Sequence, residues 1–143
     1  MKIAVDFDGT IVEHRYPAIG EEKLFAIDTL KQLQKLGYHL ILWTFRNGKE
    51  LDEAVEYCRK RGVEFYAVNK SYPEERFDEN EISRKIDADI FIDDRNIGGF
   101  PGWSEIWQIL NPDAADSEYN DLSNLLDREK RSVGSRLKKL FNK

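Results

Sequence analysis

The chain alternates short apolar segments with amphipathic ones, and this alternation limits the fold more than any other feature of the sequence. We expect strands at residues 2–7, 38–43, 63–68 and 90–92, and helices at 21–36, 48–61 and 103–110. Strands that are separated by helices form parallel sheets with right-handed crossovers. The sequence therefore predicts an α/β fold, a three-layer Rossmann-like sandwich with helices on both faces of a parallel sheet.

The size and composition of the chain indicate a globular protein. Its 143 residues amount to about one domain, and the net charge of -5 argues against a protein that coats nucleic acid. The single cysteine, Cys58, excludes an internal disulfide framework and fits a reducing compartment. Neither a signal-peptide pattern nor an apolar run of transmembrane length is present, so we expect a cytoplasmic protein without a membrane span.

The composition changes after Pro112, which divides the chain into a predicted core at residues 1–110 and a helical C-terminal extension at 111–143. The end of the chain, residues 136–143, is basic and carries apolar residues at helical spacing. Such a helix can bind a membrane surface or a partner. We favour packing on its own domain or on a second subunit, because the run is short and Gly134 interrupts it.

Polar side chains follow the expected strands at the points where they end. They are Asp6 and Asp8 at the end of the first strand, Thr44 after the second, and Asp93 and Asp94 after the fourth. The carboxyl ends of parallel strands meet at one edge of a sheet, where α/β proteins bind ligands. Four carboxylates at one edge repel each other unless they hold a cation, and Mg²⁺ suits oxygen ligands that it can share with a phosphate.

These positions resemble the four motifs of the haloacid dehalogenase (HAD) superfamily of phosphatases. In chain order, the motifs are matched by DFDGT at residues 6–10, by Thr44, by Lys85 and by the acidic pair Asp93-Asp94. The resemblance covers about residues 1–110 and implies a HAD-like catalytic core. Lys85 is the weakest match, and Lys70 at the end of the third strand is the alternative.

The resemblance also implies a reaction and a role for each acid. Asp6 would attack phosphorus and form an aspartyl-phosphate, and Asp8 would protonate the leaving oxygen and then activate water. The metal ligands would be Asp6, Asp8 (through its backbone carbonyl), Asp93 and Asp94. Relatives that cleave carbon–halogen bonds lack an acid at the position of Asp8, so this residue favours a Mg²⁺-dependent phosphatase or, less often, a phosphotransferase.

The remaining implied contacts concern the phosphoryl group. Thr44 and Lys85 would hold its oxygens, and the backbone N–H of Phe45 would add a donor. Arg46, in Thr-Phe-Arg, has two interpretations: it contacts the substrate, as in some family members, or it is a solvated arginine at the start of a helix. The sequence leaves both open.

Most HAD proteins carry a cap domain that selects the substrate, and here residues 11–20 and 69–87 are too short for one. A capless site is open to a large phosphorylated substrate, or it is closed around a small metabolite by the loop at residues 14–16 or by neighbours in a homo-oligomer. A nucleic-acid end phosphatase is one alternative, prompted by Arg46 and Arg95. A non-catalytic, Mg²⁺-binding regulatory module is the other.

Overall fold

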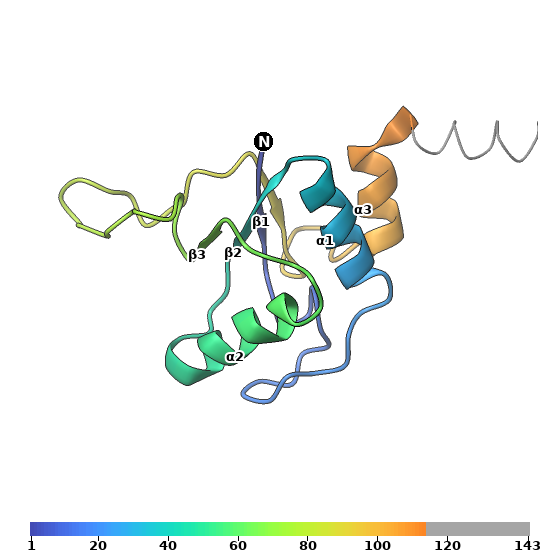
Figure 1. Cartoon of the computed structure of the whole chain (residues 1–143), viewed down its shortest axis with the longest axis horizontal. Helices are drawn as coiled ribbons and strands as arrows, with labels where there is room; N and C mark the ends of the chain where they lie inside the picture. The colour runs from blue at the N-terminus through green and yellow to red at the C-terminus, as the bar shows by residue number, and fades with distance from the viewer. Residues whose placement is uncertain (114–143) are drawn as a thin grey trace, which may run out of the picture. The chain divides into compact units, whose positions relative to one another are not determined.

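The computed structural model describes residues 1–113, which contain a four-stranded, all-parallel sheet and three helices (Figure 1). The strands lie in the order β3-β2-β1-β4. The strands are β1 (Lys2–Val5), β2 (His39–Leu42), β3 (Ala67–Val68) and β4 (Ile90–Ile92), and the helices are α1 (Ala26–Lys35), α2 (Gly48–Arg59) and α3 (Trp103–Leu110). The predicted α/β fold with a parallel sheet is confirmed.

Several elements are shorter than the sequence predicts, and the difference at β1 matters for the site. The strand ends at Val5, whereas residues 2–7 were expected. The Asp6 amide still donates to the Ile92 carbonyl at 2.9 Å, but the Phe7 carbonyl then accepts from the amide of Ile11, also at 2.9 Å. The chain therefore turns immediately after β1, and Asp8 belongs to this turn rather than to the strand.

The sheet is buried on both faces. On one face, Ala4, Ile41 and Ala67 form a cluster with Ile86 from the connection between β3 and β4. Alternation places the fully buried residues Ile3, Val5, Leu40 and Leu42 on the other face. The crossovers from β1 to β2 and from β2 to β3 run in the same direction, so their right-handedness puts α1 and α2 on the same face of the sheet.

The chain divides into two compact units, Met1–Ser104 and Glu105–Lys143, and residues 105–113 of the second unit are described. The predicted boundary near residue 110 stays a prediction, and the predicted basic helix lies outside the described residues. In residues 1–113 the longest connections, 6–25 and 69–89, contain no helix, so this part of the chain carries no extra domain. It also has no helix with the length and apolar character needed to span a membrane.

Candidate active site

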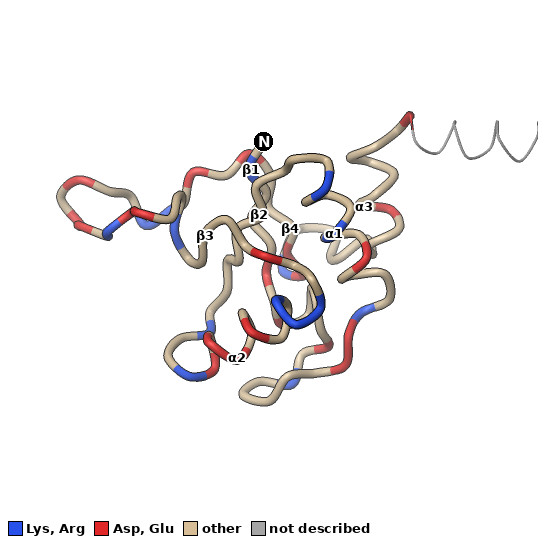
Figure 2. The backbone as a smooth tube through the Cα atoms, viewed as in Figure 1, with Lys and Arg blue, Asp and Glu red and all other residues tan. Residues whose placement is uncertain are grey.

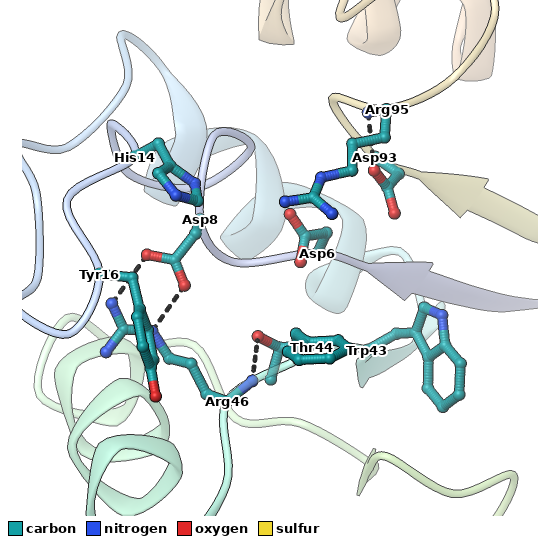
Figure 3. A pocket seen from close by; sticks show the side chains of 10 residues that line it. Asp6, Asp8, His14, Tyr16, Trp43, Thr44, Arg46, Asp93 and Arg95 are labelled. Carbon is teal, nitrogen blue, oxygen red and sulfur yellow. Dashed lines mark hydrogen bonds and ion pairs between the residues drawn. The ribbon is translucent and has the colours of Figure 1, made fainter.

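A cavity of about 660 Å³ opens at the carboxyl ends of β1, β2 and β4 (Figure 3). Its walls are formed by the turn after β1, the segment between β2 and α2, the loop after β4 and two residues of the connection before α1. The lining residues are Asp6, Asp8, His14, Tyr16, Trp43, Thr44, Phe45, Arg46, Asp93 and Arg95. The structure thus gathers polar residues from three strand ends at the edge where the sequence predicts them.

Three of the four predicted acids form a cluster. Carboxylate oxygens of Asp6, Asp93 and Asp94 all lie within 4.8 Å of one another. Asp6 is half-buried, and desolvation together with the charges of Asp93 and Asp94 raises its pKa to about 6, against the hydrogen bond from the Phe7 backbone. The groups around the cluster therefore do not neutralise the negative charge of its carboxylates.

Thr10 connects the turn after β1 with the loop after β4. Its side chain is fully buried; the hydroxyl donates to Asp6 Oδ2 at 3.3 Å and accepts from the Asp94 amide at 3.0 Å. The Thr10 carbonyl accepts a hydrogen bond of 2.8 Å from the indole Nε1 of the buried Trp103. Thr10 thus fixes the distance between Asp6 and the acidic pair Asp93-Asp94.

The donor set fits a hard divalent cation. All three clustered groups are carboxylates, and Asp94 Oδ1 is buried without a hydrogen-bond partner among the described residues. A buried carboxylate oxygen without a partner carries a large desolvation cost, which a cation would offset. Gly9 allows the approach, because a Cβ there would lie 2.2 Å from Asp94 Oδ2.

Thr44 is held by its neighbours in a way that leaves its hydroxyl proton free to donate. Its amide donates to Asn69 Oδ1 at 2.8 Å, and its hydroxyl oxygen accepts from the Arg46 amide at 3.3 Å. The side chain of Phe45, which follows, is 98% exposed and lines the cavity. Thr44 is therefore oriented for a donated hydrogen bond to an anion in the cavity.

Arg46 is a buried residue that lines the cavity, so one of its two sequence-based interpretations is wrong. The residue is 1% exposed, so it is not a solvated arginine. Its Nε and Nη2 atoms donate to the two carboxylate oxygens of Asp8, each at 2.7 Å, and Figure 3 shows the two side chains facing each other. The Asp8 carboxylate is thus engaged by a guanidinium, and it lies outside the three-acid cluster.

The predicted lysine does not line the cavity. Lys85 is exposed, and Lys70 directs its Nζ to the carbonyl of Pro73. The cationic side chains that line the cavity are Arg46, which is committed to Asp8, and Arg95, which is exposed. Arg95 directly follows Asp93-Asp94 in the chain, so its place near the acids is predictable from the sequence.

The sequence named Phe45 for its backbone N–H and Tyr16 as part of a loop beside the site, but it did not predict aromatic side chains in the lining. Tyr16 and Trp43 line the cavity together with His14 and the exposed Phe45. Trp43 continues the apolar run of β2, and Tyr16 belongs to a loop without a regular pattern. Neither context distinguishes a residue at a cavity from an ordinary packing or loop residue.

Comparison with solved structures shows the family of the chain. No protein-family model and no curated protein matches the chain. A solved structure of a conserved protein from Bacteroides thetaiotaomicron is 60% identical and has a TM-score of 0.74, and the match covers 79% of this chain and 91% of that chain. That protein is described as a conserved protein, so the relationship shows the fold and the family of this chain and carries no activity or ligand to it.

Proposed function

The chain belongs to the same family as the conserved Bacteroides protein, and we propose that it is a Mg²⁺-dependent, HAD-type phosphatase that hydrolyses a phosphomonoester. The observation that carries the proposal is the cluster of Asp6, Asp93 and Asp94, two of which, Asp6 and Asp93, line a cavity together with Thr44. The order of these residues in the chain is that of the HAD motifs. The close approach of the three carboxylates is consistent with a bound Mg²⁺, which the HAD reaction requires.

In the proposed reaction, the Asp6 carboxylate attacks phosphorus while the bond from phosphorus to the leaving oxygen breaks. Asp8 gives a proton to that oxygen and later takes one from the water that hydrolyses the aspartyl-phosphate. In this proposal the Thr44 hydroxyl and the Arg95 guanidinium, which both line the cavity, hold phosphoryl oxygens. Mg²⁺, held by Asp6, Asp93 and Asp94, would neutralise negative charge on the phosphoryl group. Lys85 remains a predicted ligand that would have to approach from outside the cavity.

The test is phosphate release from p-nitrophenyl phosphate, a probe whose ring suits a cavity lined by Tyr16 and Phe45. Activity with Mg²⁺ that disappears in EDTA and in Asp6→Asn is the expected result. Beryllofluoride, which mimics a phosphoryl group on aspartate, should form an adduct on wild-type Asp6 only. Full activity in Asp6→Asn would reject the proposal.

The two alternatives lead to different outcomes. An end phosphatase for nucleic acid was prompted partly by Arg46, but this side chain is buried on Asp8. Figure 2 also shows basic and acidic residues interspersed along the described chain rather than a basic stripe. Faster turnover of 5′- or 3′-phosphorylated oligonucleotides than of sugar phosphates would support it. A non-catalytic module would bind Mg²⁺ without forming the adduct.

A further inference from the structure

Arg46 is the most strongly engaged charged side chain in the described part of the chain, and the proposed reaction leaves it without a role. Its guanidinium donates four hydrogen bonds, two to the Asp8 carboxylate, one to the Pro17 carbonyl at 2.9 Å and one to the Ala18 carbonyl at 2.8 Å. The Cζ atom lies 4.9 Å from the centroid of the Phe7 ring and 5.3 Å from that of Tyr16. A planar fork with five donors suits this double attachment, and an ammonium group does not.

The two attachments belong to different parts of the site. Asp8 lies in the turn after β1, next to the proposed nucleophile, whereas Pro17 and Ala18 belong to the loop at residues 13–20. That loop carries His14 and Tyr16, which line the cavity. Because the Arg46 side chain is 0% exposed and that of Asp8 is 11% exposed, water does not compete effectively for these bonds.

We propose that Arg46 is a positioning residue that fixes the Asp8 carboxylate and ties it to the loop carrying His14 and Tyr16. Part of this inference, the effect on turnover, rests on the proposed function. Arg46 touches no reacting atom; it acts by holding both oxygens of Asp8 in one orientation. Replacing Asp8 should then loosen the loop, because Arg46 loses one of its two attachments. Replacing Arg46 should slow the reaction only because the Asp8 carboxylate is no longer held in one orientation.

The first experiment is a double-mutant cycle on turnover of p-nitrophenyl phosphate and of an alkyl phosphate. Arg46→Lys keeps the charge and removes the fork, and we expect kcat to fall about 10- to 100-fold, with KM within about threefold. The alkyl phosphate should lose more, since its leaving group depends more on a proton from Asp8. In the Asp8→Asn background the same replacement should cost less than about threefold. An equal loss in both backgrounds, or a loss confined to KM, would overturn the proposal.

Arg59 supplies the matched control. It forms the same kind of two-pronged pair with Glu56, at 2.7 and 2.8 Å, on the exposed surface of α2. Arg59→Lys makes the identical chemical change away from the cavity and should leave kcat and KM unchanged.

The second experiment needs no turnover, so it separates this inference from the proposed function. Hydrogen exchange of the Glu13 amide, which donates to the Glu21 carbonyl at 2.8 Å across the base of this loop, should be at least about fivefold faster in Arg46→Lys and also in Asp8→Asn, with α2 as the internal reference. Unchanged loop exchange in Asp8→Asn would overturn the coupling even in an active enzyme. If the wild type shows neither phosphate release nor the beryllofluoride adduct, the proposed function fails, while the exchange data still decide the coupling.

Discussion

Asp6 has to be ionised to act as a nucleophile, yet its surroundings favour the neutral form. Its pKa is raised to about 6, whereas an aspartate in an unfolded chain titrates near 3.9. The folded, metal-free protein therefore binds more protons than the unfolded chain between about pH 4 and pH 6. The stability contributed by Asp6 is complete below about pH 4 and is lost as the pH rises through about 6.

We predict that Asp6→Asn stabilises the metal-free protein at neutral pH, by roughly 1 kcal/mol once the partial exposure of the carboxylate is allowed for. The advantage should shrink towards about pH 4, because wild-type Asp6 is then protonated. Thermal melting of both proteins in EDTA across this range measures the difference. Asp28→Asn, at an exposed residue of α1, is the control and should show no such pH dependence. A difference between Asp6→Asn and wild type that stays constant with pH would contradict the prediction.

At this scale the sequence was informative about the acids and less so about the cations. Asp6 and Asp93 could be placed because they directly follow apolar runs, and strand ends converge in a parallel sheet. The burial of Arg46 depends on a loop far away in sequence that crosses over its guanidinium. No local pattern records that crossing. Lys85 was chosen by its order in the chain, and order does not say which way a side chain points.

At the scale of elements, the site depends on how closely the turn after β1 approaches the loop after β4. Gly9 occupies this contact with a positive φ of 92°, and Asp94 fills the space where its side chain would be. Two constraints therefore act on one glycine. The positive φ would cost another residue about 1–2 kcal/mol, and the steric overlap with Asp94 adds to it.

Gly9→Ala should destabilise the protein by about 2 kcal/mol or more and weaken Mg²⁺ binding at least about tenfold, since Asp94 must move away. Gly37→Ala is the matched control, because Gly37 has a φ of 84° but no atom within 4 Å of the added Cβ. Gly37→Ala should lower the free energy of unfolding only by the cost of the positive φ, and it should bind Mg²⁺ as the wild type does. Denaturant melts and Mg²⁺ titrations measure both effects, and equal results for the two variants would refute the steric argument.

The sequence predicts which segments form helices and which form strands better than it predicts the residues at which they begin and end. The helix at Gly48–Arg59 begins where the sequence predicts, because its apolar face is regular. The third strand shrinks from the expected 63–68 to Ala67–Val68. Among residues 1–113, β3 pairs with β2 alone, and Ile41 and Leu42 are the residues that face it in register. Strand length at a sheet edge is set by such tertiary pairing, which a run of apolar residues does not reveal.

At the scale of the whole molecule, the sheet order β3-β2-β1-β4 places β1 in the interior and brings β4 beside it. This adjacency joins the first acid of the chain to acids more than eighty residues later, so the charge cluster is a product of topology rather than of local sequence. A folded protein holds these carboxylates together, whereas the unfolded chain lets them separate. A ligand that relieves their repulsion therefore favours the folded state.

Mg²⁺ should accordingly raise the melting temperature. Binding at a concentration of about 100 times Kd contributes about 2.7 kcal/mol, which corresponds to a shift of several degrees for a domain of this size. The double variant D93N/D94N should lose most of this shift, because only Asp6 would remain in the cluster. Asp87→Asn, at an exposed carboxylate paired with Lys2, is the control and should retain it. Differential scanning fluorimetry over a Mg²⁺ series measures the shift, and an equal response in the double variant would mean that the cation stabilises the protein from elsewhere.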